Sequence, residues 1–494
     1  MKIDFQNTMN AIITMEKTCA VNEITFGSLR VWPIVRIVLW MYTIHGNPDA
    51  LAYKRQNLHE YEYQLDEATL KAVESFLATS TDLLLFCTSL CYTDRRDGLF
   101  YNKFVDPFID LFSDSLAVRK LDIAEPSTEA TQPRYHPSLL LRYATHATSL
   151  VEDECGRVQN FEPLRQAVQT HFGMDLDERL LIDYARSIQA YRVLFRTALE
   201  RIRPKAVGVV CYYYPQGMAL AWACRDLSIP CAELQHGKQG KCHGMYTHWT
   251  EVPEDGYELL PSHFWMWGEE SQDNVVAWMP EGRKFPRFAL GGSPWLGMWA
   301  EGRGFDSQPG ARDRLKTLLA GRQAVLFTMQ PIRDPLPSAL LEAMRQTPPH
   351  WVWLVRLHPQ QVGRVAQWEA FFAENGVSNV EVELPSAMDL LMLLEMSRHH
   401  VTCYSSVVYE ALALGLSTTL VHAEGASLFG GYVEKGHFRH AREPQDILAS
   451  VALGLGEVPR REARPYILRD TRRMEALIRS LCAGGTESGG WVLK

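Results

Sequence analysis

Two side chains suited to a phosphate group follow a run of apolar residues in the second half of the chain. Residues 351–357 (WVWLVRL) read as a buried strand, and Arg356 and His358 stand at its end, directly before Pro359. Pro359 stops the strand and fixes the chain direction, so both side chains are held on one face of the strand tip. A guanidinium and an imidazole in a cleft would bind a phosphate or diphosphate. The alternative is a strand end that carries His-Pro without a ligand.

A pair of adjacent hydroxyl groups follows another such segment. Ser405 and Ser406 stand between the expected strand 400–404 and a stretch with the apolar spacing of a helix, 407–414. Hydroxyls beside the free N–H groups of a helix start form an anion site, whereas simple capping needs only one serine. Glu410, about one turn into this helix, would reach a ribose hydroxyl; otherwise it is a solvated carboxylate.

A histidine follows shortly after the apolar segment 230–234 in the first half of the chain. His236 lies between Gln235 and Gly237, and the glycine permits a tight turn that leaves the imidazole where a general base must stand. A lone histidine is usually structural, but its place at a strand tip favours proton transfer. After segment 323–329, Thr328 and Gln330 offer a hydroxyl and an amide to a nucleotide.

Other polar clusters have the composition of turns. Glu254 and Asp255 precede Gly256, and residues 94–98 read DRRDG, so a loop is the favoured interpretation of both segments. The chain has no G-x-G-x-x-G after a strand, no P-loop, no H-E-x-x-H and no G-x-S-x-G. Dinucleotide-binding, P-loop, zincin and serine hydrolase functions therefore lack support, and we expect neither a cofactor nor a metal ion.

The elements that must position these residues alternate between strand and helix. In the first half, apolar runs at 81–90, 205–213 and 230–234 are separated by helical patterns, and residues 113–200 have mostly helical spacing. In the second half, strands are expected at 323–329, 351–357, 380–384, 400–404 and 417–422. This alternation predicts two doubly wound parallel α/β units, whose ligands bind at the carboxyl ends of the strands. The loops at His236, His358 and Ser405 would then converge on one interdomain cleft.

We place the domain boundary in the segment rich in Gly, Pro and Arg that follows residue 272. An N-terminal α/β domain with a helical insertion is expected over 1–288, a C-terminal α/β domain over 289–480, and a flexible Gly-rich tail over 481–494.

Composition narrows the class of protein. The chain has 494 residues, of which 46% are hydrophobic and 22% charged, and a formal net charge of −8. These values indicate a folded protein whose overall field would repel nucleic acid. No secretory signal is recognisable at the N-terminus, and residues 31–44 are too short and too interrupted to span a bilayer. A packed core helix is favoured there over a helix lying on a membrane surface.

The 10 cysteines are scattered singly, with no C-x-x-C pair of the kind that a zinc or redox site uses. Buried thiols in a reducing cytosol are the favoured interpretation.

Taken together, the motifs resemble those of GT-B glycosyltransferases of the bacterial capsule and O-antigen type. This group includes Kdo transferases, sialyl- and polysialyltransferases and CDP-glycerol glycerophosphotransferases. The similarity covers roughly residues 200–440 and rests on these segments: Leu-Gln-His-Gly at 234–237, Trp-Gly at 267–268, Gly-Gly-Ser-Pro at 291–294, Arg-Leu-His-Pro at 356–359 and Tyr-Ser-Ser-Val-Val-Tyr-Glu-Ala-Leu-Ala-Leu-Gly at 404–415.

The resemblance implies a site and a reaction. His358, Ser405 and Ser406 would bind the phosphate of a cytidine nucleotide donor. His236-Gly237 matches the catalytic His-Gly of the glycerophosphotransferases, whereas Glu254-Asp255-Gly256 matches the base motif of the sialyltransferases by letters but not by position. We expect an inverting, metal-independent transfer of a sugar, with CMP-Kdo or a CMP-sialic-acid-like donor favoured, to a growing capsule, O-antigen or lipopolysaccharide glycan or its lipid-linked primer.

In this interpretation His236 accepts the acceptor proton, and Arg356, His358 and the two serines stabilise the departing phosphate. The protein would act in the cytoplasm, and a peripheral contact with the inner face of the plasma membrane is left open. Two alternatives remain: a CDP-glycerol- or ribitol-type polyol-phosphate transferase, and a nonenzymatic binding module of a polysaccharide assembly complex.

Overall fold

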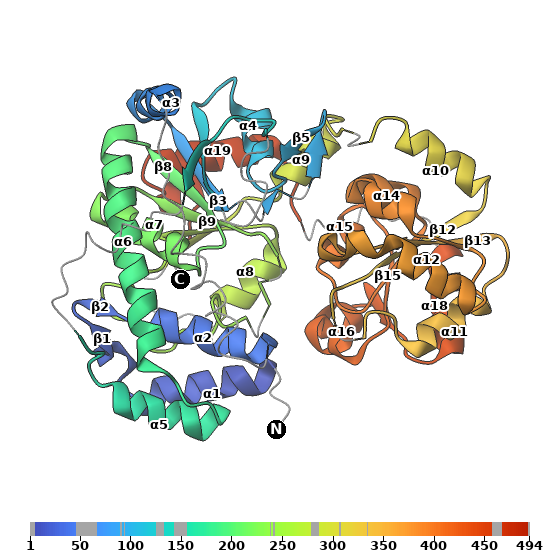
Figure 1. The fold of residues 1–494 in the computed structure, drawn as a ribbon, viewed down its shortest axis with the longest axis horizontal. Helices are drawn as coiled ribbons and strands as arrows, with labels where there is room; N and C mark the ends of the chain where they lie inside the picture. Colours follow the sequence, from blue (N-terminus) through green and yellow to red (C-terminus); the bar gives the residue numbers. More distant parts are fainter. Residues whose placement is uncertain are drawn as a thin grey trace. The chain divides into compact units, whose positions relative to one another are not determined.

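The structure, a computed structural model, divides into two compact units (Figure 1). It describes residues 5–45, 67–88, 91–92, 94–124, 133–142, 156–237, 239–240, 243–277, 286–305, 308–332, 334–456 and 467–492. Unit 1 comprises residues 1–92, 101–298 and 470–494, and unit 2 comprises residues 93–100 and 299–469.

Unit 1 is built on a parallel sheet whose strand order reverses once. Its order is β11-β10-β9-β8-β3-β6-β7, so that β3 lies beside β8 and the two halves of the sheet extend away from this pair. The strands are β3 (Leu83–Thr88), β6 (Val118–Ala124), β7 (Leu139–Arg142), β8 (Ala206–Val210), β9 (Cys231–Leu234), β10 (His263–Met266) and β11 (Arg287–Leu290).

Helices cover both faces of this sheet because alternate strand residues point to opposite sides. Leu84 and Phe86 of β3 share a core with helices α1, α2, α5, α6 and α7, whereas Leu83 and Leu85 pack with α4 and α19. The helices of unit 1 are α1 (Phe5–Thr18), α2 (Trp32–His45), α3 (Glu67–Ala78), α4 (Asp106–Phe112), α5 (Phe161–Phe172), α6 (Glu178–Ile202), α7 (Pro215–Asp226), α8 (Glu269–Val276) and α19 (Thr471–Cys482). A short hairpin joins β1 (Thr25–Phe26) to β2 (Leu29–Arg30).

Unit 2 repeats the same topology. Its sheet has the order β14-β13-β12-β15-β16-β17, which is 3-2-1-4-5-6 when the strands of this unit are counted along the chain. That is the order of a Rossmann-type sheet. The strands are β12 (Gln323–Thr328), β13 (Trp351–Arg356), β14 (Val380–Glu381), β15 (His399–Thr402), β16 (Thr418–Leu420) and β17 (Phe438–His440).

The helices of unit 2 and the elements that link it to unit 1 complete the fold. The helices are α10 (Ala311–Leu319), α11 (Ser338–Arg345), α12 (Val365–Glu374), α13 (Glu383–Ala387), α14 (Leu390–Met396), α15 (Val407–Ala413), α16 (Ala423–Leu428), α17 (Gly430–Glu434) and α18 (Pro444–Gly456). Helix α9 (Pro294–Ala300) and the hairpin of β4 (Asp94–Arg96) and β5 (Leu99–Tyr101) contain the points where one unit gives way to the other.

The expected pair of doubly wound, Rossmann-like α/β units is confirmed by the two sheets. The region 113–200 differs from its expected helical character, because it contains β6 and β7 in addition to α5 and α6. Lys120 and Asp122 interrupt the apolar pattern of β6, yet both side chains are fully buried. Lys120 forms an ion pair with Asp106, and Arg134 forms one with Asp122. Pairing is what allows charged residues into a central strand.

The observed units differ from the expected boundaries of 1–288, 289–480 and 481–494. Residue 288 lies inside β11 of the first sheet, and unit 1 continues to residue 298. The chain also returns to unit 1 at residue 470, where Leu477 of α19 and Trp491 are buried in the core beneath β3. The segment expected to be a flexible tail is therefore part of a hydrophobic core as far as Trp491.

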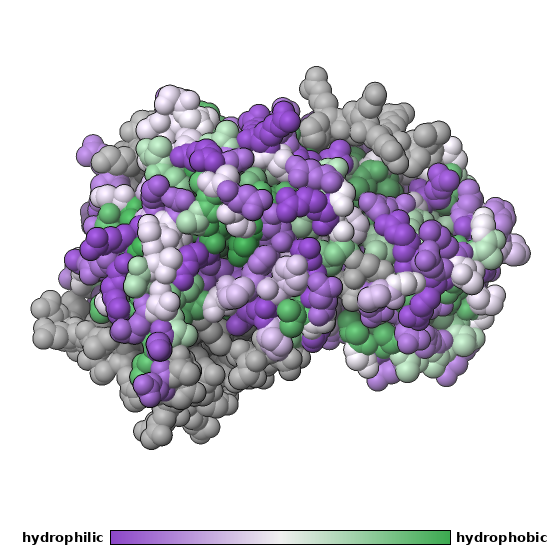
Figure 2. Space-filling model, turned by 90° about the horizontal axis from the view of Figure 1, so that it is seen from above, coloured by the Kyte–Doolittle hydropathy of each residue, from purple (hydrophilic) through white to green (hydrophobic). Residues whose placement is uncertain are grey.

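The apolar segment near the N-terminus is a core helix. Trp32, Ile34 and Leu39 of α2 are fully buried in the first core of unit 1, which is the favoured interpretation from the sequence. Within the described ranges, every helix is too short or too polar to cross a membrane. Hydrophilic residues predominate on the face seen in Figure 2, with smaller apolar patches between them.

Candidate active site

The topology of each sheet places a ligand site at the point where the strand order reverses. In such sheets the loops on either side of the reversal diverge and leave a crevice at the carboxyl ends of the strands. The reversal lies between β3 and β8 in unit 1 and between β12 and β15 in unit 2. Each unit therefore has a switch point of its own.

In unit 2 the sequence-predicted residues do gather at this edge. Thr328 at the end of β12 is level with Arg356 of β13 on one side and with Thr402 of β15 on the other. The Gln330 side-chain oxygen accepts a hydrogen bond of 2.7 Å from the Tyr404 backbone N–H. Gln330 thus ties together the two loops that flank the switch point.

The Thr328 hydroxyl is used inside the sheet. It lies 2.9 Å from Nε2 of His400, a buried histidine of β15, and the residue is 4% exposed. Thr328 therefore links β12 to β15 at the switch point. Its expected role was that of a direct ligand of a nucleotide.

Arg356 also has internal partners. Its guanidinium donates to the carbonyl oxygens of Pro385, at 2.8 Å, and of Met388. These carbonyls belong to the middle of α13 and to Met388, the residue after that helix. The positive charge is fixed at the sheet edge by these bonds, which makes Arg356 a positioning group for the β13 loop.

His358 is placed at the strand tip, as expected. Its Nδ1 accepts the Gln360 backbone N–H at 3.3 Å and so caps the short 3-10 helix Pro359–Arg364, in which Pro359 is the first residue. With Nδ1 accepting, the ring proton of neutral His358 is on Nε2. The half-buried ring can thus present an N–H donor.

The two serines differ in their surroundings. The Ser405 hydroxyl oxygen accepts the Val407 backbone N–H at 3.3 Å, so this residue acts as a cap. Ser406 is exposed and its side chain caps nothing. Glu410 lies half-buried about one turn further along α15. Of the two serines, Ser406 is therefore the one that solvent can reach.

In unit 1 the structure brings His236 together with groups that the motifs alone do not reveal. His236 Nε2 lies 3.2 Å from the Tyr213 hydroxyl, and Nδ1 lies 3.3 Å from the carboxylate of Glu233. His236 follows β9 and Tyr213 follows β8, two paired parallel strands. The imidazole is therefore held between the carboxyl ends of adjacent strands.

Glu233 is completely buried inside β9. One of its carboxylate oxygens faces His236 and accepts a hydrogen bond from the Tyr246 hydroxyl, while Oε2 has no hydrogen-bond partner. Burial raises the pKa of Glu233. Burial alone would lower the pKa of His236, but Cys211 and Glu233 beside its ring raise that pKa to about 10. The pair thus holds a proton at neutral pH.

A second histidine, His243, packs among the aromatic residues near His236 but is uncharged at neutral pH. Burial and the nearby His236 lower its pKa to about 3, so its ring is neutral. It stacks on Trp40, with ring centroids 4.7 Å apart, and packs against Tyr246 at 4.6 Å.

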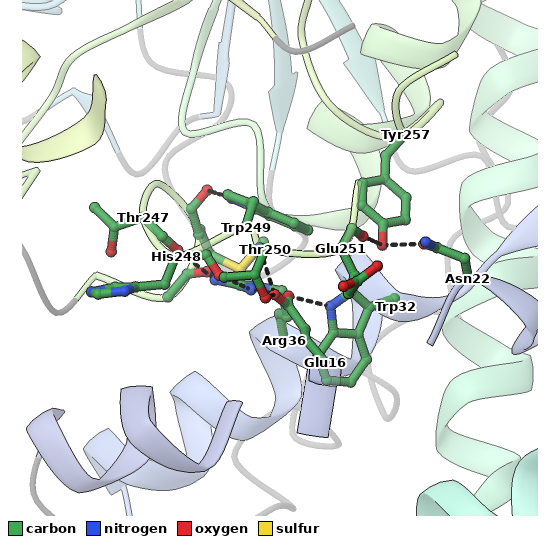
Figure 3. A network of polar contacts seen from close by, with 12 residues as sticks. Glu16, Asn22, Trp32, Arg36, Thr247, His248, Trp249, Thr250, Glu251 and Tyr257 are labelled. Atoms are coloured by element: carbon green, nitrogen blue, oxygen red, sulfur yellow. Dashed lines mark hydrogen bonds and ion pairs between the residues drawn. The ribbon is translucent and has the colours of Figure 1, made fainter. Parts of the chain in front are cut away.

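The loop that carries His243 and Tyr246 is fixed by a buried ion pair (Figure 3). Glu16 of α1 and Arg36 of α2 form a salt bridge in which both side chains are 0% exposed. Arg36 donates to the carbonyls of Gly244 at 2.8 Å and Thr247 at 2.6 Å. Glu16 Oε2 accepts from the backbone N–H and hydroxyl of Thr250. The N-terminal helices therefore hold the loop that surrounds His236 and Glu233.

The expected acidic pair of Glu254 and Asp255 lies elsewhere in unit 1. Asp255 forms ion pairs with Arg30 at 3.2 Å and with Arg225 at 3.1 Å, and Glu254 is exposed. Arg225 is in the last turn of α7, whereas Tyr213 precedes the start of that helix. A 12-residue helix is about 18 Å long, so Asp255 is not gathered with His236. Its contacts describe a clamp between β2 and α7.

The sequence motifs do not place Tyr213 or Glu233 beside His236. A signal for Glu233 was present, since a carboxylate in the middle of the buried strand 231–234 demands a partner. In the parts of the chain that the structure describes, no three His, Cys, Asp or Glu side chains are grouped so that they could hold a metal ion.

Comparison with known proteins yields distant structural likenesses. No family model matches the sequence. No curated protein matches it significantly. A putative UDP-N-acetylglucosamine 2-epimerase from Listeria monocytogenes has 12% identity and a TM-score of 0.48, with 81% of this chain and 96% of that chain covered.

Two further solved structures have similarly low sequence identity. The UDP-GlcNAc 2-epimerase from Neisseria meningitidis bound to UDP-GlcNAc has 14% identity and a TM-score of 0.46, covering 81% of this chain and 99% of that one. The calicheamicin glycosyltransferase has 14% identity and a TM-score of 0.41, covering 83% and 96%. Because these TM-scores are below 0.5, the fold is assigned from the two sheets themselves.

Proposed function

We propose that the protein is an inverting, metal-independent glycosyltransferase that uses a nucleotide-activated sugar. The observation that carries this proposal is the pair formed by half-buried His236 and fully buried Glu233, held at the carboxyl end of β9 in an open parallel sheet. A histidine oriented by a carboxylate is suited to accept a proton from a hydroxyl nucleophile. The acceptor hydroxyl would bind at His236 in unit 1.

The nucleotide donor would bind to unit 2. Its sheet has the 3-2-1-4-5-6 order, and Gln330, Ser405, Ser406 and His358 stand on loops at its carboxyl edge. The hydroxyl of exposed Ser406 and a His358 N–H would donate to phosphate oxygens, and Glu410 would accept from a ribose hydroxyl. Arg356 would contribute through its fixed charge.

In the proposed inverting transfer, one bond to the anomeric carbon forms as another breaks. The acceptor oxygen attacks the anomeric carbon, the bond from that carbon to the phosphate oxygen breaks, and the nucleotide leaves with the electron pair. Neutral His236 accepts the acceptor proton, with Glu233 stabilising the imidazolium that forms. Groups on unit 2 would stabilise the departing phosphate in place of a metal ion.

The resemblance of the motifs to capsule and O-antigen enzymes supports the choice of substrates. We therefore assign a cytidine nucleotide donor such as CMP-Kdo or a CMP-sialic-acid-like sugar, and a capsule, O-antigen or lipopolysaccharide glycan, or its lipid-linked primer, as the acceptor. The corresponding place of action is the cytoplasm, and a peripheral contact with the inner face of the plasma membrane is left open.

Thermal unfolding of the full chain with CMP, CDP, UDP and GDP tests the donor, because a ligand that binds the native state raises the unfolding temperature. The proposal expects the largest rise with CMP. Release of CMP from CMP-sugars in the presence of glycan acceptors then tests transfer. Turnover of CDP-glycerol but not of CMP-sugars would identify a polyol-phosphate transferase instead. Binding without any release would indicate a nonenzymatic module.

A further inference from the structure

The loop that follows β9 contains two buried glutamines with opposite surroundings. Gln235 is 3% exposed; its Nε2 donates to the Gly237 carbonyl oxygen at 2.9 Å and to the Ser271 hydroxyl at 3.0 Å, and its Oε1 accepts the Trp267 backbone N–H at 2.6 Å. Gln239, four residues later, is 2% exposed, yet neither its Oε1 nor its Nε2 has a hydrogen-bond partner among the described residues. The same side chain is satisfied at one position and unpaired at the other.

An unpaired amide inside a protein is an arrangement that folds normally avoid. A polar group that is buried without a partner loses its hydrogen bonds to water and gains none in return, and nearly all buried polar groups are therefore paired. A glutamine amide has one acceptor oxygen and two N–H donors. Gln239 thus offers both kinds of bond to a group that the described part of the chain does not supply.

Gln239 lies inside a small loop whose two ends meet at Tyr213. The loop leaves β9 at His236, whose ring centroid is 5.9 Å from that of Tyr213, and returns at His243, whose ring centroid is 5.5 Å from the same ring. The His243 backbone N–H donates to the Gly240 carbonyl oxygen at 3.0 Å, which forms a turn directly after Gln239. Three residues of chain span at most about 11 Å, so Gln239 belongs to the surroundings of His236.

Open space and aromatic rings lie in the same part of unit 1. A Cβ added at Gly237, directly after His236, would meet no atom within 4 Å in the described structure. Tyr213, His243 and Phe104 are half-buried, and the Phe104 ring lies edge-on to that of His236 with centroids 6.3 Å apart. Binding sites for small molecules combine aromatic walls with a few polar groups that fix the orientation of the ligand. These rings provide the walls, and Gln239 provides such a polar group.

A second unpaired atom narrows the chemistry of the ligand. Glu233 is fully buried, and within the described ranges its Oε2 has no hydrogen-bond partner. A carboxylate oxygen only accepts hydrogen bonds, whereas the Gln239 amide both accepts and donates. Hydroxyl groups meet both needs, because each has one donor and two acceptor positions. A carboxylate or phosphodiester ligand brings no donor and would be repelled by Glu233.

We propose that the side-chain amide of Gln239 binds the acceptor sugar through two neighbouring hydroxyl groups, accepting from one and donating to the other. Gln239 then selects acceptors that carry such a pair of hydroxyls and orients them beside His236. This inference rests on the proposed function, because it takes unit 1 as the acceptor side. It adds the chemical class that this side recognises, which is a neutral polyhydroxyl ring.

Binding of methyl β-glucoside, methyl β-galactoside and methyl α-mannoside to the full-length protein, without nucleotide, tests this assignment. Each of these probes has neighbouring hydroxyl groups. Saturation-transfer NMR detects binding, and a titration gives its affinity. The parent protein is expected to bind at least one of them. Gln239→Met keeps the length of the side chain and removes the amide, so it should weaken that binding ~10-fold or more, the effect of losing two hydrogen bonds.

Thermal unfolding distinguishes a ligand-binding amide from a structural one. Because the fold supplies no bond to Gln239, Gln239→Met should leave the unfolding temperature unchanged or raise it. Gln235→Met removes the three bonds of its amide and should lower that temperature. Gln361→Met is the matched control for binding. Gln361 is a buried glutamine of unit 2 whose Oε1 also lacks a partner in the described structure, and its replacement should leave glycoside affinity unchanged.

Equal glycoside affinity of the parent and Gln239→Met would overturn the proposal, as would failure of the parent to bind any of the three probes. A fall in unfolding temperature as large as that of Gln235→Met would instead give the Gln239 amide a structural role. Nucleotide release from CMP-sugars is measured separately. Glycoside binding that depends on Gln239, in a protein that releases no nucleotide, would keep Gln239 as a sugar-binding residue and reject the proposed transfer.

Discussion

At the scale of single residues, the proton on His236 decides how the proposed reaction depends on pH. The interactions with Cys211 and Glu233 that raise its pKa to about 10 keep the imidazole protonated at neutral pH. A general base must be neutral to act. The proton-accepting form of His236 is therefore a minority species that grows as the pH rises toward 10.

Replacement of His236 by Ala should lower turnover by ~10²-fold or more while nucleotide affinity stays nearly unchanged, because proton removal acts in the transition state. In the parent protein, the rate of nucleotide release should rise with pH up to about 10. Calorimetric titration with CMP and pH–rate profiles measure the two quantities. A rate that is highest at neutral pH and falls above 10 would instead make His236 a proton donor.

Ser405 and Ser406 give a second residue-level prediction. Replacing both with Ala should weaken CMP binding by ~10-fold while costing only ~1 kcal/mol of folding free energy, the usual effect of a lost cap. Asp470→Ala is the matched control, since it removes a cap that accepts two N–H groups at 3.1 Å from α19 in unit 1. Equal CMP affinity in the folded double variant would reduce the serines to caps.

At the scale of helices and strands, the Glu16–Arg36 pair binds α1 and α2 to the loop beside the active-site candidates (Figure 3). Arg36→Met leaves a buried carboxylate without its partner and should destabilise the protein by about 3–5 kcal/mol. Glu16→Gln combined with Arg36→Met should cost less than the single change. Urea unfolding of both variants provides the comparison. Arg165→Ala, which breaks exposed pairs with Glu162 and Asp175, should leave the stability almost unchanged.

The buried histidines of β15 predict instability in acid. Burial lowers the pKa of His399 and of His400 to about 3, against about 6.5 in an unfolded chain. Each contributes stability that is present above pH ~6.5 and lost as the pH falls toward 3. Thermal unfolding between pH 7 and 4 should show this loss, and His399→Gln should reduce its slope. His350→Gln, at an exposed position, should leave the slope unchanged.

The strands that sequence reasoning found and missed differ in one physical respect. Runs such as 83–88 and 323–328 are apolar on both faces, as strands between two helix layers must be. β6 (VRKLDIA) breaks that pattern because its charges are neutralised by Asp106 and Arg134, which are separated from it in sequence. The His236–Tyr213 contact was equally invisible, since it depends on the register of β8 against β9.

At the scale of the whole chain, the two halves share a topology, but unit 1 depends on the last residues of the chain. Composition suggested a mobile tail for 481–494, since glycines crowd it. The structure instead places Trp491 in the core, with its ring 4.8 Å from that of His263 and its backbone neighbour Val492 bridged to Phe288 of β11. Local composition could not reveal this return, because His263 and Trp265, on which the Trp491 ring packs, lie more than 200 residues earlier.

Trp491 therefore provides a test of how the chain is divided. It is 0% exposed and shares its core with Leu83 of β3 and Leu477 of α19, so Trp491→Ala should destabilise unit 1 by about 3–5 kcal/mol. Val492→Ala is the matched control: Val492 is 50% exposed and its strand bridge is made by the backbone, so its cost should stay below about 0.5 kcal/mol. Urea unfolding followed by hydrogen exchange would locate the effect. Loss of protection in β3 and β8, with β12 and β15 unaffected, is expected if the C-terminal segment belongs to unit 1. Equal stability of the two variants would show that this segment does not contribute to the core in solution.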